Sequence, residues 1–154
     1  MGMDQWLMAK TKETQYLTEA TGACSGLFPM APNIEGCQQI WYWRKAYDQD
    51  DYITEVLASF AALPIEVDYN CKPLKVTEEE ATKIIAHAKH VLATHIFDEE
   101  GYDVTGCRNN CGWMASGTTW ESNRKWEEVI QAFTIAKEIY EKDPDAEVYY
   151  FVWY

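Results

Sequence analysis

The sequence lacks the glycine-rich loops that bind nucleotide phosphates. Neither GxxxxGK followed by Ser or Thr nor GxGxxG occurs, and no other glycine-rich turn links a predicted strand to a predicted helix. In such loops, glycine lets the backbone approach the phosphates closely. The absence excludes enzymes that hold ATP or NAD in this way, and we expect no bound cofactor.

Long apolar runs are also missing. The first ten residues, MGMDQWLMAK, have neither the basic start nor the apolar core of a signal peptide. No stretch approaches the roughly 18 apolar residues that a membrane span needs. The five cysteines are an odd number, and without a secretory leader they indicate reduced thiols. We therefore expect a soluble cytosolic protein that does not bind membranes.

Basic residues are scarce. Lys and Arg number 13 against 25 Asp and Glu, which gives a formal net charge of -12. An acidic surface repels phosphate backbones, so we expect no direct binding of DNA or RNA. The same charge speeds the encounter with basic partners. The negative charge can also serve solubility alone, and the sequence does not decide between solubility and the binding of a basic partner.

Apolar and aromatic residues are abundant. The 154 residues are 47% hydrophobic and 14% aromatic, which is too apolar for a disordered chain despite the charge. This length suits one globular domain, residues 1–154, with a single sizeable core.

Two segments at opposite ends of the chain have the character of strands. Residues 2–10 alternate loosely between apolar and polar side chains, which predicts a short half-buried strand. Residues 147–154, EVYYFVWY, are almost all apolar or aromatic, which predicts a buried strand beside the first. A short strand is also expected within residues 65–76, where Pro73 confines it to a sheet edge.

The first of three predicted helices spans Gln38 to about Ala62. Its apolar residues fall close to a helical stripe, with a weak stretch at 48–51. Pro64 ends this helix, because proline cannot continue it. The stripe consists of Ile40, Trp43, Tyr47, Ile53, Val56, Leu57 and Phe60.

Capping signals mark the other two helices. Thr77 and Glu80 form a capping box, and we expect this helix to run to about Phe97. Thr118 and Glu121 predict the start of the third helix. The apolar faces consist of Ile84, Ile85, Ala88, Val91, Leu92 and Ile96, and of Trp126, Val129, Ile130, Phe133, Ala136, Ile139 and Tyr140. Together these elements predict an α+β fold, with about three helices packed on a small antiparallel sheet that pairs the N- and C-terminal strands.

A cluster of aromatic and basic residues stands at the start of the first predicted helix. Trp41 and Trp43 lie beside Arg44 and Lys45, a rare basic spot in an acidic chain. These residues are suited to an anionic ligand, with the rings stacked on a base. The more ordinary interpretation, which we favour, has Trp43 and Tyr47 packed inward while Arg44 pairs with nearby carboxylates.

Acidic residues gather in two places. One cluster lies in the weak stretch of the first helix, where no EF-hand spacing follows and a solvated helix face is the simpler interpretation. The other opens residues 98–117, which together with residues 18–37 are predicted to be irregular. The clusters are Asp48, Asp50 and Asp51, and Asp98, Glu99, Glu100 and Asp103.

The sequence does not assemble a metal site or a catalytic centre. Cys107 and Cys111 are spaced more loosely than a typical zinc pair, and His87 and His90 share one helical face. His95 falls near the opposite side of that helix, so the three imidazoles do not easily converge. We predict no metal ligand and no catalytic residue, and whether the two cysteines bind metal with His87 and His90 stays open.

The order of several short motifs resembles an uncharacterised family of small proteins from tailed bacteriophages. The motifs are Met1-Gly2-Met3-Asp4, Tyr42-Trp43-Arg44-Lys45-Ala46, Val76-Thr77-Glu78-Glu79, Gly112-Trp113 with Ser116-Gly117, and Tyr149-Tyr150 with Trp153. They extend over nearly the whole chain. Where the family follows YWRKA with Asn and an Ile-His pair, this chain has residues 47–51 without histidine. Some members carry kinase-like labels, which nothing in this chain supports.

This resemblance implies a phage-encoded protein acting in the cytoplasm of a bacterial host. A small acidic protein of that origin is similar to the anti-CRISPR and other inhibitors that phages direct against host nucleases, some of which mimic DNA. We expect a binding protein rather than an enzyme, with a basic nucleic-acid-binding host protein as its partner. A nucleotide-binding protein using the segment Trp41–Lys45 is one alternative. A particle-assembly protein that forms homodimers through the C-terminal aromatic strand is another.

Overall fold

The computed structural model describes residues 3–13, 34, 36–64, 69–97, 99–102, 104–105 and 119–154, without the side chains of residues 119–121. Over these residues the chain forms β1 (Asp4–Lys10), β2 (Gln38–Arg44), α2 (Tyr47–Phe60), β3 (Leu74–Val76), α3 (Glu78–Ala93), α4 (Thr119–Lys142) and β4 (Glu147–Trp153). The predicted α+β class is confirmed. The irregular segments predicted at 18–37 and 98–117 lie largely outside the described residues.

The four strands form one antiparallel sheet in the order β2-β1-β4-β3. β1 and β4 pair along their whole length, from Asp4 opposite Trp153 to Lys10 opposite Glu147. The predicted pairing of the N- and C-terminal strands is therefore confirmed. β3 is an edge strand that begins directly after Pro73, as expected for a residue that cannot donate to the ladder.

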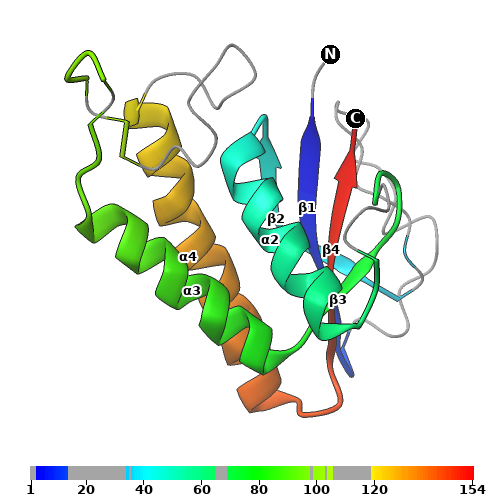
Figure 1. Cartoon of the computed structure of the whole chain (residues 1–154). Coiled ribbons are helices and arrows are strands. Elements are labelled where there is room, and N and C mark those ends of the chain that lie inside the picture. Colours follow the sequence, from blue (N-terminus) through cyan, green and yellow to red (C-terminus); the bar gives the residue numbers. More distant parts are fainter. Residues whose placement is uncertain are drawn as a thin grey trace.

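The three helices that the structure describes cover the same face of the sheet, as Figure 1 shows, and α2 also contacts the edge strand β3. The predicted apolar side of α4 contributes Trp126, Val129, Phe133 and Ala136 to the main core, where all four are buried. A second, smaller cluster on the other face of the sheet contains Trp6, Met8 and Cys37.

β1 is buried on both faces, so the prediction of a half-buried strand is wrong. Leu7 and Ala9 point into the main core, whereas Trp6 and Met8 point into the second cluster. The reason is the position of β1 inside the sheet, with a neighbouring strand on each edge and apolar residues packed over both faces.

The prediction of a helix from Gln38 is also wrong for its first part, because residues 38–44 form β2 and the helix begins at Tyr47. The pairing with β1 shifts between Leu7 and Met8, and this bulge turns both Ile40 and Trp41 toward the main core. Because Ile40 and Trp41 are adjacent and face the same side, the apolar residues of β2 do not alternate strictly, and their spacing resembles that of a helix. The β-branched and aromatic run IWYW nevertheless favours a strand.

The capping box of α3 is present as predicted. The Glu80 N–H donates to Thr77 Oγ1 at 3.3 Å, and the Thr77 N–H donates to Glu80 Oε1 at 2.9 Å. Replacing Thr77 by alanine should lower the free energy of unfolding by about 1 kcal/mol, because the start of the helix loses the side-chain partner of an N–H group. Urea unfolding measures this loss. Thr82→Ala, on an exposed position of the same helix, should change stability little, and equal losses in both variants would contradict this role.

Candidate binding surface

The rings of the aromatic and basic segment are turned into the protein. Trp43 is 3% exposed and stacks on Phe133, with ring centroids 6.4 Å apart and planes at 24°. Trp41 is half-buried, 6.2 Å from Trp43. The interpretation that Trp43 packs inward is confirmed, and a ligand base has no access to its face.

Arg44, the last residue of β2, and Lys45, in the turn between β2 and α2, are both exposed. Lys45 has a φ of 54°, which is uncommon for a residue with a side chain. Two hydrogen bonds hold it there: its N–H donates to Met3 O at 2.7 Å, and Lys125 Nζ donates to its carbonyl at 3.0 Å. Arg44 and Lys45 therefore present two cations at one end of the sheet. The rings of Trp41 and Trp43, which are their neighbours in the sequence, point into the protein instead.

The acidic cluster of α2 is mostly buried, so the interpretation as a solvated helix face is wrong for two of its three residues. Asp48 is 2% exposed and accepts a hydrogen bond from Ser122 Oγ at 3.4 Å. Asp50 is 8% exposed, whereas Asp51 faces solvent. The side chain of α4 that partners Asp48 is 74 positions away in the sequence, which is why no local pattern indicated the burial.

Asp50 belongs to a buried polar network that joins α2 to the two central strands. The Tyr150 hydroxyl donates to Asp50 Oδ1 at 2.5 Å, and Gln5 Nε2 donates to the Tyr150 oxygen at 3.1 Å. Gln5 also closes a pair of hydrogen bonds with the backbone of Ala46, at 2.9 and 3.0 Å. Burial raises the pKa of Asp50 to about 6 and raises that of Tyr150 well above its usual value. The network fixes the start of α2 against the sheet.

α3 ends at Ala93, so the prediction that it runs to about Phe97 and buries Ile96 is wrong. Thr94 adopts an extended backbone with φ −112° and ψ 115°, which suits its β-branched side chain. Beyond it the chain leaves the helix and carries its apolar residues outward. Phe97 is 63% exposed and Tyr102 is 68% exposed, the two highest values among the large apolar residues that the structure describes.

Hydrogen bonds close the base of this loop. The Ile96 N–H donates to Thr105 Oγ1 at 2.9 Å, and the Val104 N–H donates to Ile96 O at 2.7 Å. Thr105 itself is 1% exposed. Gly101, with a φ of 86°, allows the chain to reverse between the two sides. The loop is thus tied at its base while its apolar side chains face solvent.

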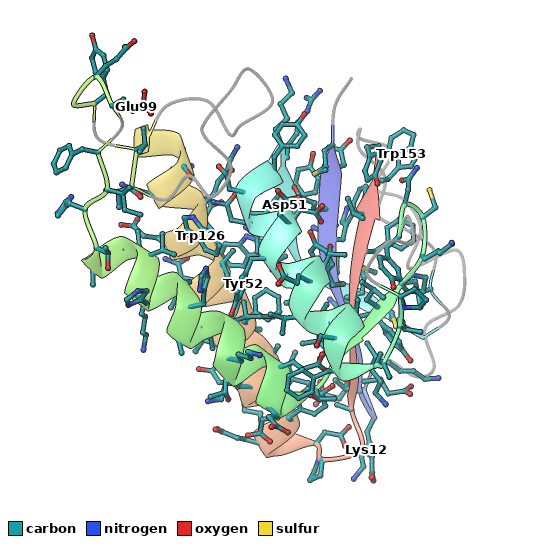
Figure 2. All side chains as sticks on the ribbon, in the orientation of Figure 1. Lys12, Asp51, Tyr52, Glu99, Trp126 and Trp153 are labelled. Atoms are coloured by element: carbon teal, nitrogen blue, oxygen red, sulfur yellow. The ribbon has the colours of Figure 1, made fainter. Side chains whose placement is uncertain are left out.

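Carboxylates stand beside these exposed rings. Glu99 and Glu100 are both exposed, and Figure 2 shows Glu99 on the part of the chain that extends beyond the end of α3. Asp98 and Asp103, predicted for the same cluster, lie outside the described residues. We call residues 96–105, in the part that the structure describes, the acidic–aromatic loop. Its carboxylates were predicted from the sequence, whereas its two aromatic side chains were not.

His87 of α3 packs against aromatic side chains of α2 and α4. Its ring stacks on Tyr52 at a centroid distance of 3.6 Å and meets Trp126 edge-on at 5.4 Å. In the part of the chain that the structure describes, no group of three His, Cys, Asp or Glu residues is placed to hold a metal ion. Cys107 and Cys111 lie outside that part. Whether they bind a metal ion together with His87 and His90 therefore stays open, as in the sequence analysis.

None of the helices that the structure describes has the length and apolar character to cross a membrane. Comparisons with protein families, with curated proteins and with solved structures give no match.

Proposed function

We propose that this protein binds a basic protein through its acidic–aromatic loop. The observation that carries the proposal is the pair of exposed rings, Phe97 and Tyr102, on a loop that also presents Glu99 and Glu100. Exposed aromatic rings become binding anchors when a partner desolvates them. Carboxylates around the anchors speed the encounter with a cationic surface and select against acidic partners.

The partner we propose is a nucleic-acid-binding protein of a bacterial host, such as a nuclease or another defence protein, which the complex would inhibit in the host cytoplasm. The net charge of -12 and the resemblance to phage proteins support this choice. Anchored docking fits the surface better than extended mimicry of DNA, because cations interrupt the negative charge. Along α3, for example, the exposed Lys83 and Lys89 follow Glu78 and Glu79.

Binding should fail when both the anchors and the charges of the loop are removed. The variant Phe97→Ala/Tyr102→Ala/Glu99→Gln/Glu100→Gln is expected to retain a basic host protein about 100-fold less well than the wild type, because it loses its proposed hot spots. Retention is measured from host lysate at low salt, and the captured protein is then purified and titrated.

A control variant removes two charges and one exposed aromatic ring elsewhere on the protein. Phe60→Ala/Glu138→Gln/Glu141→Gln changes residues of α2 and α4 outside the loop and should bind like the wild type. Raising the salt concentration should release the partner from both the wild type and this control. Recovery of no basic protein, or equal recovery by the loop variant, would count against the proposal.

A further inference from the structure

Three side chains stand in a row across the end of the sheet where β1 begins and β4 ends. Asp4 of β1 lies opposite Arg44 of β2 on one side and opposite Trp153 of β4 on the other. Residues directly opposite each other in antiparallel strands point to the same face of the sheet. The three residues therefore share one face, with the acidic residue between the cation and the indole.

That face is the one opposite the helices. Asp4 has the same parity on β1 as Trp6, whose side chain belongs to the smaller cluster, and the Tyr42 hydroxyl donates to Asp4 Oδ1 at 2.5 Å. The next row of the sheet holds the rings of Tyr42, Trp6 and Phe151, with the two outer centroids 5.6 and 6.0 Å from that of Trp6. A row of aromatic rings thus lies next to Arg44, Asp4 and Trp153 on the same face of the sheet.

The two outer members of the row are accessible. Trp153 is 50% exposed and Arg44 is also exposed, in contrast to the buried Trp43. Figure 2 shows Trp153 at the end of β4, on the opposite side of the view from Glu99 and the acidic–aromatic loop. The exposed ring that accompanies Arg44 is therefore Trp153, from the far end of the chain, rather than Trp41 or Trp43.

We propose that this row binds a nucleoside monophosphate, at a site separate from the acidic–aromatic loop. The Arg44 guanidinium binds the phosphate through paired N–H donors. The Trp153 indole stacks on the base. The backbones of Arg44 and Trp153 are two strand spacings apart, which is about 10 Å. Because the Arg44 side chain is long, its guanidinium can lie closer to the indole, at a distance that one nucleotide can bridge.

Asp4 limits what the site accepts. Asp4 is 8% exposed and its Oδ1 accepts the Tyr42 hydroxyl, which holds an acidic side chain at the centre of the row. A ligand with one phosphate at the Arg44 end avoids this acidic side chain, whereas a chain of phosphates or a nucleic-acid backbone would lie against it. The class is therefore a single nucleotide, in keeping with the acidic character of the whole chain.

The test compares three probes by NMR: adenosine 5′-monophosphate, adenosine and inorganic phosphate. The reporter is the indole N–H signal of Trp153, assigned by its disappearance in Trp153→Leu. The nucleotide should shift this signal in the millimolar range or below and should bind more tightly than either of its halves, because both contacts act together.

Variants then separate the two contacts. Arg44→Gln and Trp153→Leu should each weaken nucleotide binding about tenfold, a loss expected for removing one stacking ring or one paired phosphate contact. Lys75→Gln, which removes an exposed cation of the opposite edge strand β3, should leave binding unchanged, and so should the loop variant described above. Arg44 and Trp153 are exposed, so their variants should remain folded and melt within about 4 °C of the wild type.

Two results would overturn the proposal. One is a Trp153 signal that does not move with the nucleotide. The other is binding that both variants retain in full, which would place the nucleotide elsewhere on the protein. Neither result bears on the acidic–aromatic loop, because that proposal is tested with a protein partner and with different variants.

Discussion

Replacing Trp126 by alanine is expected to lower the free energy of unfolding by about 3–5 kcal/mol, the range for large aromatic side chains removed from a core. Trp126 is 1% exposed and belongs to α4. Its ring meets His87 of α3 at 5.4 Å and Tyr52 of α2 at 6.4 Å. One side chain thus fills the junction of α2, α3 and α4, and Figure 2 shows Tyr52 and Trp126 in this region.

The size of this effect follows from the cavity that alanine leaves behind. The surrounding helices relax incompletely around such a void, so the rings of His87 and Tyr52 would face empty space where the indole now packs. The matched control is Trp153→Ala, which removes the same side chain from a half-exposed position and should cost about 1 kcal/mol or less. Urea unfolding of both variants gives the comparison, and similar losses would show that Trp126 does not organise the junction.

The pH dependence of stability should carry a contribution from Asp50. Burial raises the pKa of this carboxyl from 3.8 to about 6. The folded protein then holds a proton that the unfolded chain releases between about pH 4 and pH 6. The stabilisation is fully present below about pH 4 and is lost as the pH rises to about 6. At about 1.4 kcal/mol for each pKa unit, the loss amounts to about 3 kcal/mol.

Asp50→Asn should remove this pH dependence. The amide oxygen still accepts the Tyr150 hydroxyl, but the side chain has no charge to bury. The difference in free energy of unfolding between wild type and variant should therefore change by about 3 kcal/mol between pH 4 and pH 7, in the direction that favours the variant at pH 7. The raised pKa of Glu80 gives a slope of the same sign, which cancels in this difference.

Glu138→Gln provides the control, because Glu138 is an exposed carboxylate of α4 and is not among the groups that act on the pKa of Asp50. The pH dependence that comes from Asp50 should persist in this variant. A difference between wild type and Asp50→Asn that does not change with pH would mean that Asp50 does not titrate in the buried network.

Sequence features that act within a few residues correctly predicted where α3 begins and that β3 lies at a sheet edge. The capping box at Thr77 and Glu80 needs residues only three positions apart, and Pro73 acts on its own neighbours. The strand at 147–154 was predicted because an almost wholly apolar segment of that length has to be buried. Each of these signals depends on chemistry that the sequence carries within a few residues.

The predictions were wrong where a residue distant in the sequence determines the local structure or the burial of a side chain. The bulge opposite Leu7 and Met8 hid the alternation of β2, and a pairing with β1 cannot be recognised within β2 itself. Asp50 resembles a surface residue until Tyr150, 100 positions later, supplies a buried donor. In the candidate binding surface, the carboxylates of the loop were predicted, but Phe97 was assigned to a helix that ends earlier.

Photo-crosslinking can show whether the acidic–aromatic loop contacts a basic host protein. A photoreactive phenylalanine derivative replaces Tyr102 in one variant and Phe60 in another; both positions are exposed. Phe60 lies against Lys83, ten residues before the end of α3, which is about 15 Å along the helix from the loop. We expect a covalent adduct with a basic nucleic-acid-binding protein from position 102 and none from position 60. Adducts of equal yield from both positions, or none from position 102, would contradict this expectation.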